Sequence, residues 1–134
     1  MHIGAVHRFL RLLAVPVTAV LLLAYQPGNV FALNANNIIA YPVPFNPCIQ
    51  TMKIGYDPAV TPDAVDRVKI EIFDINGDVV LEREYSSLAP AVIWNGRNGS
   101  GRMVGAGMYI IKVTVEKSDT GEHGVKIIRI LVNR

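Results

Sequence analysis

Hydrophobic and polar residues alternate along much of the chain, and this alternation predicts β-strands. In residues 67–75 (RVKIEIFDI) the apolar side chains of Val68, Ile70 and Ile72 are separated by charged ones. Residues 108–116 (MYIIKVTVE) show the same period of two. A strand with this period has one buried and one solvated face. No segment shows a convincing helical period.

Five further segments are predicted as strands from their residue types and the turn residues between them: residues 36–41, 52–56, 78–85, 91–95 and 125–132. Asn76-Gly77 is the strongest short hairpin signal, because a type I′ turn needs positive φ at both central positions. Residues 118–122 (SDTGE) form a turn cluster before the last strand. About seven short strands with turns every 8–12 residues predict an all-β fold, an antiparallel β-sandwich of immunoglobulin-like type.

The first 32 residues have the pattern of an export signal instead. Residues 1–11 carry two arginines and no acid, residues 12–25 are almost wholly apolar, and Val30-Phe31-Ala32 places small residues at the −3 and −1 positions. This order predicts a cleavable signal peptide over residues 1–32 and a single domain over residues 33–134. An uncleaved anchor is the alternative, although a helix that crosses a bilayer needs roughly 20 apolar residues.

Cleavage after Ala32 would remove two of the 13 Lys and Arg residues and none of the 11 acids, leaving 11 − 11 = 0. The formal charge of +2 therefore belongs to the export signal. The basic stripe that nucleic-acid binding needs is missing. Cys48 is the one cysteine and has no internal partner. We expect it to be a small buried residue; an exposed thiol able to cross-link two chains is the alternative.

The most unusual stretch is residues 94–109, WNGRNGSGRMVGAGMY, which resembles a phosphate-binding loop. Arg102 and Met103 stand where that loop has Lys and Ser or Thr. A phosphate loop also leads into a helix whose amino end faces the anion, and the residues that follow here predict a strand. Val104 stands where a dinucleotide fingerprint has its third glycine. The sequence therefore argues against nucleotide binding.

Structural roles are expected for these glycines instead. We expect Gly96, Gly99 and Gly101 to make tight turns at positive φ, where a Cβ is costly. Gly105 and Gly107 are expected to admit a close backbone approach or a bulge before the next strand.

Other candidate chemistry is weak. Residues 74–78 (DINGD) begin like a calcium loop, but Val79 replaces its glycine and Tyr85 its bidentate Glu. A hairpin turn whose Asp and Asn side chains bond to local backbone is the favoured interpretation, with weak calcium binding left open. His123 lies in a polar turn with no nucleophile nearby, and we expect it to be exposed.

Two aromatic residues and a sequon are the remaining candidates in the sequence. Trp94 and Tyr109 are single aromatic residues at strand positions and are expected in the core rather than in a binding site. Residues 98–100 are formally a glycosylation sequon, which matters only in a eukaryotic secretory pathway. We predict no catalytic, cofactor-binding or metal-binding residue, no cofactor, and a protein that is not an enzyme.

The quoted segments together resemble a known family. Residues 40–47 (AYPVPFNP), 68–80 (VKIEIFDINGDVV) and 94–113 are similar, in this order, to the FlgD-like immunoglobulin-like domain, and the basic apolar ending 126–134 also fits. This is the β-sandwich domain of the bacterial flagellar hook-capping protein, and its pattern is related to the C-terminal sorting domains of type IX secretion cargo. Val43 stands where the family usually has Asn.

The resemblance implies a bacterial, non-enzymatic module and does not select a role. Such domains normally end a longer protein, whereas here the domain is expected to be the whole mature chain. A hook-capping protein also has an N-terminal region that engages the hook and no cleaved signal. We therefore expect a free-standing exported domain in the periplasm, outside the cell or at the cell surface.

The function expected first is a structural or protein-interaction module whose partner is a protein of the envelope or secretion machinery. It would bind through a sheet edge, its loops or the extended segment 34–45, which otherwise pairs in its own sandwich. No nucleic acid, small-molecule substrate or membrane span after signal cleavage is expected. The alternative is a type IX secretion sorting domain, a C-terminal targeting module, or a remnant of a larger secreted protein. An enzyme or a carbohydrate-binding lectin has no motif behind it.

Overall fold

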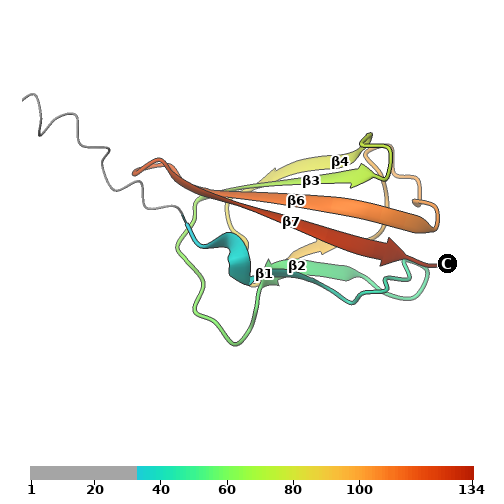
Figure 1. Ribbon diagram of the computed structural model, residues 1–134, viewed down its shortest axis with the longest axis horizontal. Coiled ribbons are helices and arrows are strands. Elements are labelled where there is room, and N and C mark those ends of the chain that lie inside the picture. The colour runs from blue at the N-terminus through green and yellow to red at the C-terminus, as the bar shows by residue number, and fades with distance from the viewer. Residues whose placement is uncertain (1–32) are drawn as a thin grey trace, which may run out of the picture. The chain divides into compact units, whose positions relative to one another are not determined.

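Two antiparallel sheets pack face to face in the computed structural model, which describes residues 33–134 (Figure 1). The signal peptide expected in residues 1–32 lies outside the described residues. The elements are a single 3₁₀ turn and seven strands: η1 (Ala35–Asn37), β1 (Ile38–Tyr41), β2 (Met52–Tyr56), β3 (Arg67–Asp74), β4 (Val79–Tyr85), β5 (Val92–Trp94), β6 (Gly107–Lys117) and β7 (Glu122–Val132). The prediction of an immunoglobulin-like sandwich of about seven strands is confirmed.

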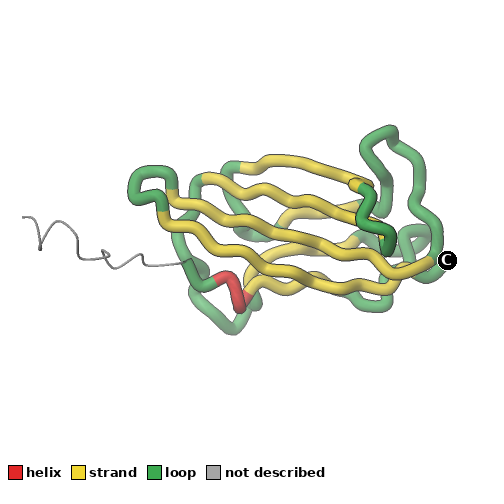
Figure 2. Tube along the Cα trace, turned by 45° about the horizontal axis from the view of Figure 1, so that its top comes forward, coloured by secondary structure: helices red, strands yellow, loops and turns green. Residues whose placement is uncertain are grey.

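The smaller sheet has the strand order β1-β2-β5 and the larger has β4-β3-β6-β7. Figure 2 shows the long strands of the larger sheet side by side. β3 and β6 lie at its centre, whereas β4 and β7 form its edges. β6 and β7 pair without a register shift over their full length of 11 residues each. No helix in residues 33–134 has the length and apolar character needed to span a membrane.

Alternation along the central strands builds the core. In β3, Val68, Ile70 and Ile72 are buried between the sheets, as the period of two predicts. The same holds for four residues of β6, which are Tyr109, Ile111, Val113 and Val115. From the smaller sheet and the segment after β1 come Ile38, Phe45, Met52, Ile54 and Trp94. Each fully buried aliphatic or aromatic side chain stabilises the fold by about 1.5–3 kcal/mol.

The β3–β4 hairpin differs from the predicted type I′ turn. Gly77 has φ +87°, but no residue other than glycine has positive φ in residues 33–134, so Asn76 does not. Farther along the strand pair, a separate register shift of one residue lies between Ile72 and Phe73. At the turn itself, the Gly77 N–H donates to the Asp74 carbonyl at 3.0 Å. This is a type I turn followed by glycine with a bulge. The Asp74 side chain favours it by accepting hydrogen bonds from the N–H groups of Asn76 and Asp78.

The starts of the first and last strands differ most from prediction, and the other boundaries differ by one residue at most. The first strand begins at Ile38 because residues 35–37 form the 3₁₀ turn, where the Asn34 side chain accepts the Asn36 N–H at 3.0 Å. The last strand begins at Glu122, so His123 lies in β7 opposite Glu116 rather than in a turn. His123 is exposed, as expected.

The segment around β1 joins the two sheets at one side of the sandwich. β1 pairs with β2 in the smaller sheet. The chain is also bonded to β7 at both ends of this segment. The Leu33 N–H donates to the His123 carbonyl at 3.2 Å, and the Phe45 N–H donates to the Leu131 carbonyl at 2.8 Å. The extended N-terminal segment therefore pairs within its own sandwich, which is the outcome that the sequence favoured.

Candidate functional site

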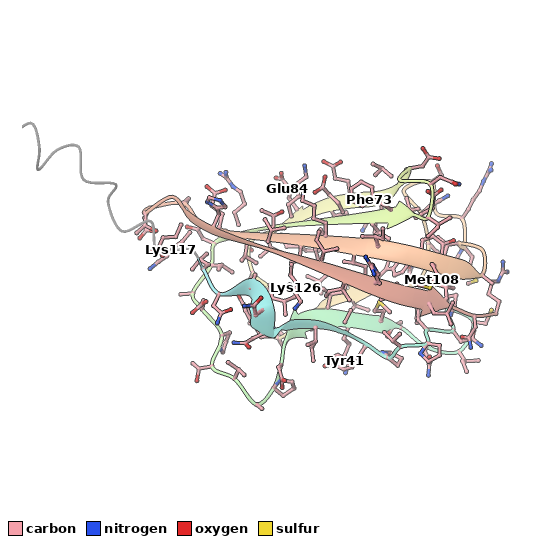
Figure 3. All side chains as sticks on the ribbon, in the orientation of Figure 1. Tyr41, Phe73, Glu84, Met108, Lys117 and Lys126 are labelled. Carbon is pink, nitrogen blue, oxygen red and sulfur yellow. The ribbon has the colours of Figure 1, made fainter. Side chains whose placement is uncertain are left out.

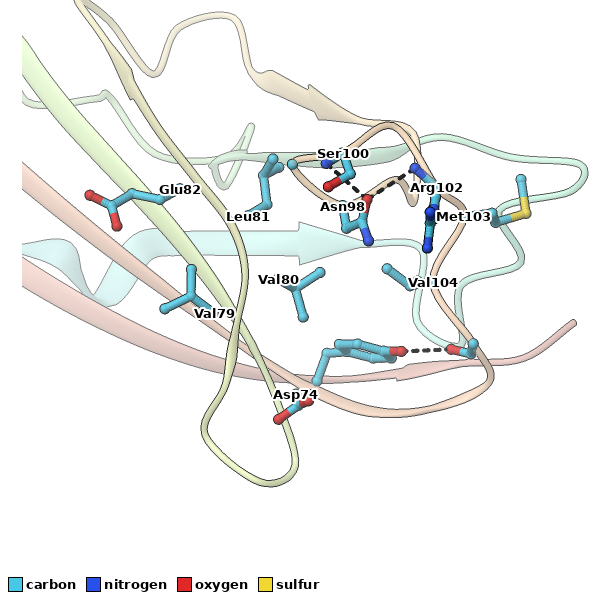
Figure 4. Close-up of a pocket in the computed structure, with 13 residues that line it drawn as sticks. Asp74, Val79, Val80, Leu81, Glu82, Asn98, Ser100, Arg102, Met103 and Val104 are labelled. Carbon is cyan, nitrogen blue, oxygen red and sulfur yellow. Dashed lines mark hydrogen bonds between the residues drawn. The ribbon is translucent and has the colours of Figure 1, made fainter.

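A hollow lies between the glycine-rich loop, residues 95–106, and the edge strand β4 (Figure 4). Its volume is about 610 Å³. Polar side chains at its wall include Asp74, Glu82, Asn98 and Arg102, and Tyr109 also lines it. The glycine-rich loop is the stretch whose sequence resembles a phosphate-binding loop. Whether it can bind an anion depends on whether its backbone N–H groups are free.

The backbone N–H groups at the centre of the loop donate hydrogen bonds within the domain. The Asn98 N–H donates to the Arg102 carbonyl at 2.8 Å, and the Val104 N–H donates to the Gly96 carbonyl at 2.9 Å. The Gly99 N–H reaches across to the Val80 carbonyl of β4 at 3.0 Å. A phosphate loop works by pointing such groups at its ligand. Here they are already bonded, and strand β6 follows the loop where a phosphate site has a helix.

The Asn98 side chain stabilises the turn formed by residues 98–102. Its side-chain oxygen accepts the N–H groups of Ser100 and Arg102, each at 3.0 Å, as drawn in Figure 4. The Arg97 guanidinium adds a hydrogen bond to the Gly101 carbonyl at 2.9 Å. The sequence pattern marked Asn98 only as part of a sequon. The signal for its structural role was an Asn two residues before a polar turn residue, which is typical of an Asx turn.

Three of the five glycines in residues 94–109 do not have the roles expected of them. Gly96 and Gly101 are at φ +76° and +80°, as predicted, but Gly99 is not in this region and contributes its N–H to β4 instead. Gly105 and Gly107 approach no neighbouring backbone: a Cβ built on either meets no atom within 4 Å. Nor does the register of β6 shift at Gly107. The close approach or bulge expected at these two positions is therefore wrong.

The segments that carried the family resemblance meet at this end of the sandwich. The Phe45 and Trp94 rings lie 5.6 Å apart, and Trp94 meets Tyr109 edge-on at 6.4 Å. The Trp94 indole N–H donates to the Arg97 carbonyl at 2.9 Å, which ties the loop to the core. Trp94 and Tyr109 are both buried, so they act in the core as predicted.

Tyr109 and Asp74 are two titratable residues that line the hollow. The Tyr109 hydroxyl donates to the Gly105 carbonyl at 2.8 Å. Burial raises the pKa of Tyr109, and the charge of Asp74 raises it further. The hydroxyl therefore stays protonated and serves as a structural donor, while the Asp74 carboxylate is occupied by the hairpin. No group of three or more His, Cys, Asp or Glu side chains among residues 33–134 is placed to hold a metal ion.

His123 lies at the opposite end of the sheet from this hollow. Tyr109 pairs with Ile130, seven residues along β7 from His123, which corresponds to roughly 23 Å of strand. The structure therefore does not bring the imidazole to the carboxylates of the hollow.

Cys48 is exposed, which corrects the expectation of a small buried residue. Its own N–H donates to the Asn46 side chain at 2.9 Å, and the next N–H groups return to the Asn46 carbonyl. This tight surface turn directs the thiol outward. The Cys48 sulfur lies 3.9 Å from the sulfur of Met103.

Comparison with known proteins agrees with this architecture. Residues 50–119 match the family model of the FlgD Ig-like domain. The chain belongs to this family. No curated protein matches the chain.

Two solved structures share the FlgD Ig-like fold. One is PorZ of Porphyromonas gingivalis, described as an essential bacterial surface component of the type-IX secretion system, with 24% identity and a TM-score of 0.51. The other is dimeric latent PorU of the same organism, with 19% identity and a TM-score of 0.51. The match covers 74% of this chain and 12% of PorZ, and 71% of this chain and 9% of PorU. The chain thus corresponds to a small part of each, and the likeness is one of fold.

Proposed function

We propose that residues 33–134 act as a non-enzymatic protein-interaction domain of the bacterial envelope or cell surface, exported by a signal peptide in residues 1–32. One observation carries the proposal most directly. The side chains of Asp74, Asn98 and Tyr109 around the hollow make internal hydrogen bonds, whereas large apolar side chains are exposed on the sheets. An apolar surface of this kind is typical of a site for another protein.

Of the eleven large apolar side chains that are exposed in residues 33–134, four on β6 and β7 lie on the outer face of the larger sheet: Met108, Val125, Ile127 and Leu131. Ile127 is 53% exposed, and Met108 and Leu131 are each 41% exposed. Figure 3 shows Met108 toward the end of the sheet that carries the glycine-rich loop, with Lys117 at the other end. Four charged side chains of the same face pair with one another: Lys69 contacts Glu82 at 3.0 Å, and Lys112 contacts Glu71 at 3.6 Å. The apolar part has no such partner within the described domain.

Chemical cross-linking of the native envelope fraction tests this function. We expect the chain to be recovered cross-linked to a second protein, and recovery as a lone monomer counts against an interaction role. N-terminal sequencing of the recovered protein tests export at the same time. A mature chain that begins at Leu33 supports the predicted signal peptide, and one that begins at Met1 contradicts it.

A second candidate is a sorting domain for type IX secretion. The described role of PorZ at the bacterial surface and the basic, apolar ending of this chain favour it. Truncation of the last residues is a poor test, because Ile130 and Val132 of β7 are fully or almost fully buried. Leu131→Ser and Arg134→Ser change exposed side chains instead. Loss of surface delivery in a type IX-competent host, with the fold intact, supports sorting, and unchanged delivery rejects it.

A further inference from the structure

β7 is an edge strand. Near each of its ends, a backbone carbonyl that points away from β6 accepts a hydrogen bond from another segment. Between these two carbonyls, the outward backbone N–H and C=O groups make no such bond in residues 33–134. In an antiparallel pair, successive residues point their N–H and C=O alternately toward the partner strand and away from it. The carbonyls of His123 and Leu131 point away from β6, since they accept from Leu33 and Phe45. Because the register is unbroken, the N–H and C=O groups of Val125, Ile127 and Arg129 also point away from β6. None of these three bonds to another element among residues 33–134.

The free stretch is short and bounded. Val125 and Arg129 are four residues apart, or about 13 Å of strand. Between its two hydrogen bonds to β7 the N-terminal segment runs through η1 and β1, where it stays near β7 but makes its backbone pairs with β2. A hollow of about 500 Å³ opens at one end of the stretch, between residues 33–36 and 123–125. An added strand therefore has room for about five residues, whereas a second copy of the 11-residue β7 would meet Leu33 and Phe45.

The other three sheet edges are less suited to an added strand. β5 has three residues and β1 has four. β4 carries Glu82, Arg83 and Glu84 in succession, and the glycine-rich loop already bonds to Val80. Mixed charges and a covering loop are common means of blocking an edge. On β7, Lys126 has this protective character, but its ammonium group donates to the Asn36 carbonyl at 3.2 Å and lies on the side facing η1 (Figure 3).

The charge of Arg129 indicates which kind of peptide segment would bind at this edge. The Arg129 side chain is exposed on the outer face, opposite Ile110 and beside the exposed Ile127 and Leu131. None of the four ion pairs among residues 33–134 includes Arg129. Val125 and Ile127, at 48% and 53% exposure, offer apolar neighbours at the two preceding outer positions. A strand added here would place a residue beside each of these three side chains.

We propose that the β7 edge from Val125 to Arg129 binds a short extended segment of a second protein by strand addition. The segment carries a carboxylate beside Arg129 and apolar side chains beside Val125 and Ile127. Main-chain hydrogen bonds supply affinity, and the alternate side chains supply specificity. This inference rests on the proposed interaction function and names its surface and the chemistry of the partner.

Two substitutions in the full chain separate this site from the rest of the sheet. Ile127→Pro removes an N–H that points away from β6, so the β6–β7 ladder keeps its hydrogen bonds while the edge loses a donor. Arg129→Glu reverses the charge. Arg83→Glu is the matched control, because Arg83 is an exposed arginine on the opposite edge strand and belongs to no ion pair among the described residues. Thermal unfolding verifies that each variant is folded.

The probe is a short blocked peptide of alternating threonine and valine with one glutamate near its end, compared with the same peptide carrying lysine in place of glutamate. We expect the glutamate peptide to bind roughly fivefold more tightly than the lysine peptide to the parent chain and to Arg83→Glu. Arg129→Glu should reverse this preference, and folded Ile127→Pro should bind neither peptide. Exchange of the Val125, Ile127 and Arg129 amide hydrogens should slow when the glutamate peptide is bound.

Absence of binding, equal binding of both peptides, or slowed exchange elsewhere in place of β7 would overturn the strand-addition site. The native envelope cross-link separates this failure from failure of the proposed function. If a partner is captured equally well by the parent, Ile127→Pro and Arg129→Glu, the interaction function stands and the β7 site is wrong. If the parent captures no partner, the proposed function itself fails.

Discussion

Gly96 packs directly on the ring of Pro47, so closely that a Cβ built on Gly96 would overlap the Pro47 Cβ. Both residues are buried, and the contact fixes the glycine-rich loop to the segment that follows β1. Gly96 is also at φ +76°, where an L side chain is strained. We expect Gly96→Ala to lower the free energy of unfolding by about 2–4 kcal/mol, since both strain and overlap must be relieved. Urea denaturation measures this loss.

Substitutions at two other glycines of the same loop separate the cost of backbone strain from the cost of steric overlap. Gly101 has φ +80°, but a methyl group at this position would meet no atom within 4 Å. Gly101→Ala should therefore cost only the backbone strain, about 1–2 kcal/mol. Gly105 has neither constraint, and Gly105→Ala should leave stability nearly unchanged. Any order other than Gly96, Gly101, Gly105 in decreasing cost would show that these structural roles are wrong.

The buried strand residues and the loop glycines show which features could be predicted from the sequence and which could not. Alternation identified the buried residues of β3 and β6, because burial of one face is the property that the period of two reports. It could not assign the glycines, since tight φ and close packing depend on what another segment places nearby, such as Pro47 at Gly96. Cys48 was misplaced for the same reason: apolar character favours burial, but the Asn46 turn directs the thiol outward. The free edge of β7 follows from strand order, which no local pattern gives.

Asp66 joins the start of β3 to the turn before β7. Its carboxylate accepts the Ser118 hydroxyl at 2.5 Å and the Ser118 N–H at 3.0 Å. The Ser118 hydroxyl is the main cause that holds the pKa of Asp66 below its ordinary value. A carboxyl with a depressed pKa in the folded state contributes stability above its unfolded pKa and loses it as the pH falls through the folded pKa. We expect Asp66→Asn to be less stable than the parent at neutral pH, and this difference to shrink below about pH 4.

Urea midpoints at neutral and acid pH measure that difference. Asp119→Asn is the control, because Asp119 lies in the same turn and its side chain makes no hydrogen bond in the described part of the chain. A gap between the parent and Asp66→Asn that stays the same at both pH values would contradict the role given to Ser118.

Tyr109→Phe tests the hydrogen bond behind the glycine-rich loop. The change removes the hydroxyl that donates to the Gly105 carbonyl and leaves the ring beside Trp94. We expect a loss of about 1 kcal/mol at neutral pH, the usual net value of such a bond. Because burial raises the pKa of the folded Tyr109, its contribution is present below the unfolded pKa and is lost as the pH rises through the folded one. Chemical denaturation at neutral and alkaline pH should show the gap closing, and a gap that widens on the alkaline side would refute this.

The exposed thiol of Cys48 can be checked directly in solution. Cys48 is the one cysteine of the chain, so any thiol signal reports on it. We expect complete reaction with a thiol reagent in native buffer, at the same extent as in urea, because the tight turn at Asn46 presents the sulfur to solvent. Cys48→Ser should leave the urea midpoint unchanged, since no buried contact is lost. Reaction that requires urea would mean that the thiol is buried, as its apolar character first suggested, and that the turn at Asn46 is placed differently in solution.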